Sequence, residues 1–274
     1  LNASTAAGDT TFTAIGNIVD VFMKSGNADL TVTYVATATA GAQTQNVSLS
    51  GVTNDTTNLT IAGVETVNIT TSAAKSTLNN LAFDAATTLN ISGDQNLTIA
   101  GSVPATAGTI DASGLTGKLS MTATFTPAAS SLTGGSNDDT ITVGSGELTA
   151  TSTYDGGAGV DTLILAAPAD WNVLTQGNVS NFEVLGAGAV GTYDFSKLSG
   201  GVAVLSAVAS TGGSVVFSNM PSSSTGTIIG TEGMDLLLAQ DSASDDATIT
   251  ISTPVTAGIT VADSIGLTEY ETVT

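Results

Sequence analysis

The sequence predicts an all-β protein folded as a parallel β-solenoid, that is, a β-helix or β-roll. Short segments that alternate apolar with small polar residues recur from end to end, as is typical of strands. Some of these segments have identical sequences, such as Asn-Leu-Thr-Ile-Ala-Gly at 58–63 and 96–101, which favours coils stacked in register. An antiparallel sandwich also fits this spacing, but its strands usually run longer and its core is richer in aromatic residues, which make up only 4% here.

We expect the chain to be organised in two parts. Residues 1–50 form a less regular β segment, in which the apolar spacing at 11–23 fits either a strand pair or a short helix. Residues 51–274 form the solenoid, with Ile, Leu and Val inside and with Thr and Asn stacked outside as ladders along the axis. Its expected strands include 58–63, 66–69, 88–93, 96–101, 140–143, 162–165, 202–205, 215–217, 248–251 and 258–261.

A nine-residue phrase occurs twice, as GGSNDDTIT at 134–142 and as GGAGVDTLI at 156–164. Both fit Gly-Gly-x-Gly-x-Asp-x-U-x, where U is a large apolar residue, although Asn137 replaces the third glycine of the first copy. Glycines permit a tight turn, which directs backbone carbonyls inward. Calcium prefers about six to eight oxygen ligands, and Asp139 and Asp161 would supply the negative charge. The phrase therefore predicts calcium-binding turns.

The two copies begin 22 residues apart, which is four residues more than two nonapeptides. We therefore expect one coil with a four-residue insertion, and both turns on the same edge of successive coils, where they can close a cage for the ion. A weaker copy, GTEGMDLLL, lies at 230–238. The residues predicted to bind the metal are Gly134, Ser136, Asp138, Asp139, Gly156, Ala158, Asp161, Gly230, Glu232 and Asp235.

Acidic residues recur in other repeated words as well. Glu65, Glu183 and Glu271 occupy the same place in an apolar-Glu-x-apolar word, and Asp84, Asp111 and Asp194 share another. These side chains can either ligate calcium or accept backbone N–H groups at turns, and the sequence leaves both interpretations open.

The composition excludes several classes of function. The 24 acidic residues and four lysines give a net charge of −20, which argues against nucleic-acid binding and favours divalent cations. The chain has no Cys and no His, so it offers no zinc site and no catalysis by those residues. Carboxylate pairs occur at 138–139 and 245–246, but solenoid lyases also need a basic residue, so we expect no enzyme; a glycosidase pair is the alternative.

The termini suggest a piece of a longer protein. The chain has no initiating Met, no N-terminal signal pattern and no run of 18 apolar residues, so we expect no transmembrane helix and a cut at each end. Without cysteine, metal is the expected stabiliser in place of disulfides.

The nonapeptides occur together with words such as GVETVNIT, DAATTLNISGDQNLTI and IDASGLTG. In this combination the sequence resembles the RTX-type surface-layer proteins of Gram-negative bacteria over most of residues 50–274. The resemblance implies a secreted protein that is exported by type I secretion, folds outside the cell with calcium and assembles with copies of itself into a two-dimensional lattice. It also implies attachment to lipopolysaccharide through a separate domain, so that this chain is a lattice-forming part on the cell surface.

The alternative is an RTX adhesin or another glycan-binding surface module. Trp171 and Tyr154 lie near the predicted calcium turns, where an aromatic ring can stack on a sugar. Tyr154 can instead cap the edge of the core, and the sequence favours this interpretation over sugar stacking.

Overall fold

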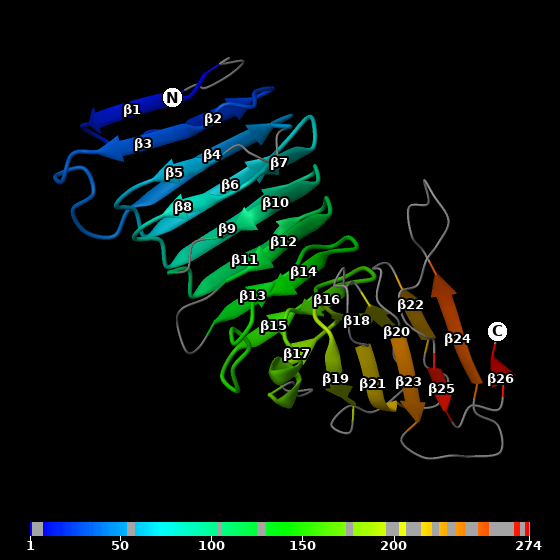
Figure 1. Ribbon diagram of the computed structural model, residues 1–274. Coiled ribbons are helices and arrows are strands. Elements are labelled where there is room, and N and C mark those ends of the chain that lie inside the picture. Colours follow the sequence, from blue (N-terminus) through cyan, green and yellow to red (C-terminus); the bar gives the residue numbers. More distant parts are fainter. Residues whose placement is uncertain are drawn as a thin grey trace. The chain divides into compact units, whose positions relative to one another are not determined.

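The structure, a computed structural model, is an all-β solenoid of about eight turns whose paired strands run parallel (Figure 1). The prediction of a parallel solenoid is confirmed, and an antiparallel sandwich is excluded. The chain divides into two units, Leu1–Ile141 with Thr151–Asp161 and Thr142–Ala150 with Thr162–Thr274. The structure describes residues 1, 8–53, 58–103, 106–124, 130–173, 178–195, 203–206, 215–220, 225–228, 234–238, 246–251, 266–268 and 272–273.

In the first unit a coil contributes up to three short strands, one to each of three sheets. Within this unit, the strands of these sheets are ordered β1-β3-β5-β8, β2-β4-β6-β9-β11-β13-β15 and β7-β10-β12. The strands are β1 (Thr10–Ile15), β2 (Val21–Lys24), β3 (Leu30–Tyr34), β4 (Thr44–Ser50), β5 (Leu59–Ile61), β6 (Thr66–Thr71), β7 (Ser76–Leu78), β8 (Leu81–Phe83), β9 (Thr88–Gly93), β10 (Leu97–Ser102), β11 (Thr109–Leu115), β12 (Leu119–Ala123), β13 (Ser131–Thr133) and β15 (Thr153–Asp155).

From β4 onward the strands of this unit repeat with a period of 22 residues, or 21 in one coil, whereas Val21 of β2 pairs with Val47 of β4, 26 residues later. Thr44 pairs with Thr66, Thr66 with Thr88, and Thr88 with Thr109. Coils that carry no nonapeptide thus have the same length as the coil between the two nonapeptides. The expectation of a shorter coil with a four-residue insertion is therefore wrong, because the path around the sheets, and not the nonapeptide, sets the coil length.

The two faces of each strand follow the alternation in the sequence. Val67 and Leu89 are paired in register and fully buried. On the outward face, Asn68 Nδ2 donates to Asn46 Oδ1 at 2.9 Å, and Asn90 Nδ2 donates to Asn68 Oδ1 at 2.8 Å. The expected apolar interior and the expected outward ladder are therefore both present.

The N-terminal segment belongs to the same stack. Residues 11–23, for which the sequence allowed a strand pair or a short helix, contribute to β1 and β2. β1 pairs with β3 and β2 pairs with β4, while β3 and β4 pair in turn with β5 and β6. The register thus continues across residue 50.

Within the second unit, parallel strands are ordered β16-β18-β20-β22-β24-β26 and β19-β21-β23-β25. A 3-10 helix, η1 (Pro168–Asn172), buries Trp171, whose ring centroid lies 5.2 Å from that of Tyr193 and 4.4 Å from that of Phe195. This aromatic cluster forms part of the core of the unit. The strands are β16 (Thr162–Leu165), β17 (Val179–Ser180), β18 (Val184–Ala187), β19 (Gly191–Asp194), β20 (Ala203–Ser206), β21 (Val215–Met220), β22 (Thr225–Ile228), β23 (Met234–Leu238), β24 (Asp246–Ile251), β25 (Gly266–Thr268) and β26 (Thr272–Val273); β14 (Thr140–Val143) spans the boundary between the units.

Most of the expected strands in this unit fall on observed ones. Residues 202–205, 215–217 and 248–251 correspond to β20, β21 and β24, whereas 258–261 lies outside the described residues. In the part of the chain that the structure describes, no helix has the length and apolar character needed to cross a membrane.

Candidate metal centre

Two glycine-rich turns, at 134–139 and 156–161, lie on the same edge of consecutive coils of the first unit. The first follows β13 and the second follows β15, and these strands are paired in register. The backbones of the turns are in contact, because the Ala158 N–H donates to the Gly135 carbonyl at 3.1 Å. The expectation that the two nonapeptides stack on successive coils is thus confirmed.

Glycine is required where the turns touch. A Cβ atom on Gly134 would lie 2.0 Å from the Gly156 carbonyl oxygen, and one on Gly157 would lie 2.2 Å from the Gly135 carbonyl oxygen. Gly157 also has a φ of +94°, which L-residues rarely adopt. The repeated glycines therefore allow the close approach of two backbones, in addition to a tight turn.

The aspartates of the two nonapeptides are buried and linked to each other. Asp139 and Asp161 are 1% and 0% exposed. The Oδ1 atom of Asp161 accepts the backbone N–H of Asp139 at 2.7 Å. Asp139 in turn accepts the N–H of Leu119 on Oδ1 at 2.7 Å and that of Gly135 on Oδ2 at 2.6 Å. The two carboxylates thus connect three successive coils through backbone donors.

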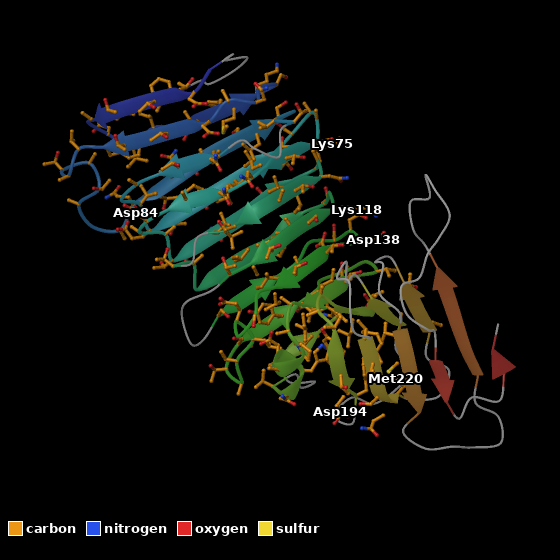
Figure 2. All side chains as sticks on the ribbon, in the orientation of Figure 1. Lys75, Asp84, Lys118, Asp138, Asp194 and Met220 are labelled. Carbon is orange, nitrogen blue, oxygen red and sulfur yellow. The ribbon has the colours of Figure 1, made fainter. Side chains whose placement is uncertain are left out.

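The surroundings set the pKa values of the neighbouring aspartates in opposite directions. Burial raises the pKa of Asp139, although the N–H groups of Leu119 and Gly135 oppose this effect. The pKa of Asp138 is lowered, chiefly by the hydrogen bond from Lys118 and next by the N–H of Val160. Lys118 Nζ lies 2.8 Å from Asp138 Oδ2, and both side chains are half exposed (Figure 2). Asp138 therefore belongs to a surface ion pair, whereas the carboxyl group of Asp139 is buried.

The other predicted ligands divide into two groups. Ser136 and Ala158 contribute backbone N–H groups to the stacking, since Ser136 donates to the Leu115 carbonyl at 3.0 Å. Gly230 and Glu232 lie outside the described residues, and Asp235 lies within β23. Asp139 and Asp161, in contrast, immediately precede β14 and β16. The structure thus brings together the predicted ligands of the first two copies.

The donor set is of the kind that calcium prefers. Asp139 and Asp161 place two carboxylates in the interior, and a divalent cation would offset their charge, since buried charges are tolerated when they are paired. Within the described ranges, no three acidic side chains converge closely enough to hold a metal by themselves. An ion held by Asp139 and Asp161 would therefore need neutral oxygens, such as the carbonyls of the turns, to complete its shell.

Sequence reasoning missed the role of the preceding coil. Lys118 and Leu119 stand 20 residues before Asp138 and Asp139, and they pair with those two aspartates. Once the 22-residue period is recognised, a basic residue about one coil before an aspartate is the signal that predicts such a partner.

Two acidic side chains of the recurring motifs accept hydrogen bonds from backbone N–H groups. Glu65 Oε2 accepts the N–H of Gln43 at 2.7 Å, and Asp84 Oδ1 accepts the N–H of Gly63 at 2.7 Å. Both bonds connect neighbouring coils. For these two residues the structure favours the second interpretation, in which acidic side chains satisfy backbone groups at turns.

The aromatic rings suggested for sugar stacking are buried. Tyr154 is 1% exposed, and Trp171 is 3% exposed within its aromatic cluster. Tyr154 therefore packs in the core of its unit, as the sequence favoured. Neither ring face is open to a ligand.

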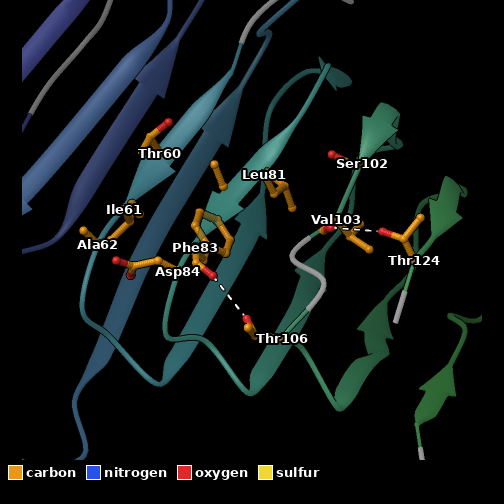
Figure 3. A pocket seen from close by; sticks show the side chains of 11 residues that line it. Thr60, Ile61, Ala62, Leu81, Phe83, Asp84, Ser102, Val103, Thr106 and Thr124 are labelled. Atoms are coloured by element: carbon orange, nitrogen blue, oxygen red, sulfur yellow. Dashed lines mark hydrogen bonds between the residues drawn. The ribbon is translucent and has the colours of Figure 1, made fainter. Parts of the chain in front are cut away.

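A hollow of about 470 Å³ lies beside β8, the last strand of its sheet (Figure 3). Its lining is mainly apolar, with Leu81, Phe83 and Val103, and Thr106 Oγ1 donates to the Phe83 carbonyl at 3.3 Å. Among the described lining residues, Asp84 is the one acidic side chain, and it accepts the N–H of Gly63. The described lining therefore contains no pair of groups suited to acid–base chemistry.

Comparisons of the chain with models of protein families, with curated protein sequences and with solved structures find no match.

Proposed function

We propose that this chain is a structural module of an extracellular bacterial surface layer, stabilised by calcium at its stacked turns. A parallel solenoid supports this role, because it presents long regular faces that copies of one protein can use to pack side by side. The net charge of −20 and the resemblance of the nonapeptide-containing sequence to RTX-type surface-layer proteins also support it. Export by type I secretion and attachment through a separate domain are part of the same proposal.

The observation that carries the proposal is the burial of Asp139 and Asp161 in consecutive coils, linked by a 2.7 Å hydrogen bond. Without a cation, the burial of two charged carboxylates carries a desolvation cost that their backbone donors offset only in part. Calcium held by Asp139 and Asp161 would supply the opposing charge. At a hundredfold excess over its dissociation constant, one bound ion stabilises the folded state by about 2.7 kcal/mol. Folding would then depend on the calcium outside the cell.

The outward face of the first unit supports lateral packing. Across β4, β6 and β9 it carries columns of Thr, Asn and Ser in register, for example Asn46, Asn68 and Asn90. These side chains are short and uncharged, so two such faces can approach without the repulsion that a net charge of −20 would otherwise cause. Calcium bound at acidic edges would further reduce that repulsion between copies.

Calcium titration of the purified chain tests the proposal. We expect calorimetry to detect binding, urea unfolding to show a loss of stability in EGTA, and electron microscopy to show ordered arrays only with calcium. The double variant Asp139→Asn/Asp161→Asn should lose the calcium response, whereas Asp94→Asn should keep it. Asp94 is a suitable control because it is exposed and, among the described residues, its carboxylate accepts a hydrogen bond only from Gln95 Nε2, at 3.3 Å. Equal stability with calcium and with EGTA would refute the calcium-dependent function.

No contact among the described residues favours the glycan-binding alternative specifically. Its support was the pair Tyr154 and Trp171, and both rings are buried. We therefore retain the lattice module as the proposed function.

A further inference from the structure

The outer surface contains several Asn-x-Ser/Thr tripeptides, the acceptor pattern for N-linked sugars. Such tripeptides are frequent by chance in a chain this rich in Asn, Ser and Thr. The structure is therefore needed to decide which asparagine amide is available. Among the described residues the tripeptides begin at Asn46, Asn58, Asn68, Asn90, Asn96 and Asn178.

In five of these six tripeptides the amide nitrogen already donates a hydrogen bond within the protein. A sugar attached to that nitrogen, before or after folding, would crowd or displace this hydrogen bond, so modification there competes with the fold. In the ladder, sugars on neighbouring coils would also stand only about 4.8 Å apart. The donated bonds are Asn46 to Asp20 (3.1 Å), Asn58 to Asp29 (3.0 Å), Asn68 to Asn46 (2.9 Å), Asn90 to Asn68 (2.8 Å) and Asn178 to the Val173 carbonyl (2.9 Å).

Asn96 differs from the other five. It is exposed, immediately before β10, and its Nδ2 donates to none of the described residues. Its Oδ1 accepts the backbone N–H of Lys118 at 3.0 Å, and its own carbonyl accepts the N–H of Ser76 at 2.9 Å. The residue is therefore fixed in position with its amide nitrogen available.

The hydroxyl that the tripeptide requires lies on the same side. Leu97, between Asn96 and Thr98, is fully buried, so the alternation of a strand places Asn96 and Thr98 together on the outward face. Asp94 is exposed two residues before Asn96 and offers a carboxylate to a basic group of a transferase. The segment 94–98 thus presents a complete acceptor at the surface.

We infer that Asn96 is a site of N-linked glycosylation that the folded solenoid can carry without losing any of its hydrogen bonds. The donor is a sugar activated through a phosphate ester at C1. The bond between C1 and the phosphate oxygen breaks, the bond between Nδ2 and C1 forms, Nδ2 releases one proton to a base of the transferase, and the phosphate leaves as an anion. Oδ1 of Asn96 keeps its bond to Lys118 throughout.

Peptide mapping by mass spectrometry of the protein isolated from its producing cells tests the inference. We expect a hexose or a longer glycan on the peptide that contains Asn96, and unmodified peptides for Asn68 and Asn90. Recovery of Asn96 without a glycan would overturn the inference. A glycan on the ladder asparagines together with a bare Asn96 would overturn it as well.

Variants expressed in the same cells identify the acceptor atom. Asn96→Gln and Thr98→Ala should each lose the glycan completely, whereas Asn68→Gln should retain it. Circular dichroism of each variant confirms that it has folded. If the glycan persists on the same peptide in Asn96→Gln, the sugar is attached to another atom and the inference is wrong. Calcium binding should be equal in Asn96→Gln and in the unmodified sequence, which separates this result from the proposed function.

Discussion

The backbone N–H of Asp139 donates a 2.7 Å hydrogen bond to the Oδ1 atom of Asp161, which occupies the same place one coil later. Asp139 itself accepts N–H groups from Leu119, one coil earlier, and from Gly135 in its own turn. Each carboxylate therefore satisfies backbone donors of a neighbouring coil that would otherwise be buried without a partner. This relationship explains why an aspartate at this position supports the stack even before any ion is bound.

Replacing Asp139 by Asn should destabilise the first unit by about 1–3 kcal/mol, because one of its two backbone donors would then face an amide NH2 group that cannot accept. Urea unfolding in EGTA, followed by far-UV circular dichroism, measures this cost without a calcium contribution. Asp94→Asn changes the same chemical group at the surface and should stay within about 0.5 kcal/mol of the parent. Equal losses in the two variants would show that the buried hydrogen bonds contribute nothing.

The glycines of the turns should differ sharply in their tolerance of alanine. Gly41 and Gly157 both have positive φ angles, +78° and +94°, but a Cβ on Gly41 meets no atom within 4 Å. Gly41→Ala should therefore cost only the backbone term of about 1–2 kcal/mol. Gly157→Ala should cost about 1–3 kcal/mol more, because its Cβ would lie 2.2 Å from the Gly135 carbonyl. Similar unfolding free energies for the two variants would contradict the close stacking of the turns.

Much of the fold could be predicted because each coil repeats the pattern of apolar and polar residues of the coil before it. Leu89 and Asn90 occupy the positions that Val67 and Asn68 occupy one coil earlier. This repeated alternation determines both the buried face and the outward ladder. The coil length was mispredicted because the nonapeptide suggested its own period. The paired Thr66 and Thr88 show that the true unit of repetition is the whole path around the sheets.

The site could be predicted only in part, for a different physical reason. The turns and their aspartates are local patterns, so GGAGVD is recognisable by itself. The partners of those aspartates are distant in sequence, and Lys118 and Leu119 become visible only when the coils are aligned. Likewise, the availability of the Asn96 amide nitrogen becomes visible only in the structure, where Lys118 of the next coil donates to Asn96 Oδ1 and leaves Nδ2 without an acceptor among the described residues.

The asparagine ladder should contribute measurably to stability. Asn68 both donates to Asn46 and accepts from Asn90, so Asn68→Ala removes two hydrogen bonds between coils. At about 0.5–1.5 kcal/mol for each bond, we expect a loss of about 1–3 kcal/mol in urea unfolding. Thr98→Ala, on the outward face of β10, makes a similar truncation without removing a ladder bond and should cost less. A loss no greater than that of Thr98→Ala would mean that water replaces the ladder bonds without cost.

Another buried carboxylate, Asp170 in the second unit, should make stability depend on pH. Its Oδ1 accepts the N–H of Gly146 at 2.9 Å, while its Oδ2 is buried and accepts no hydrogen bond. Burial raises the pKa of Asp170 above its value in the unfolded chain, which is about 3.9. The folded state therefore binds this proton more tightly than the unfolded state. The resulting stabilisation is complete below about pH 4 and is lost as the pH rises through the folded-state pKa.

Asp170→Asn should abolish this dependence. The variant keeps an oxygen for the Gly146 N–H but has no charge to bury, so its stability relative to the parent should increase as the pH rises from 4 to 7. Fluorescence of Trp171, the single tryptophan, reports unfolding of the unit next to the changed residue. The raised pKa of Asp139 is present in both proteins and cancels in the difference.

Asp170→Ala, which leaves the Gly146 N–H without its acceptor, should be less stable than Asp170→Asn at every pH. A difference between parent and Asp170→Asn that is constant from pH 4 to 7 would show that folding does not raise the pKa of Asp170.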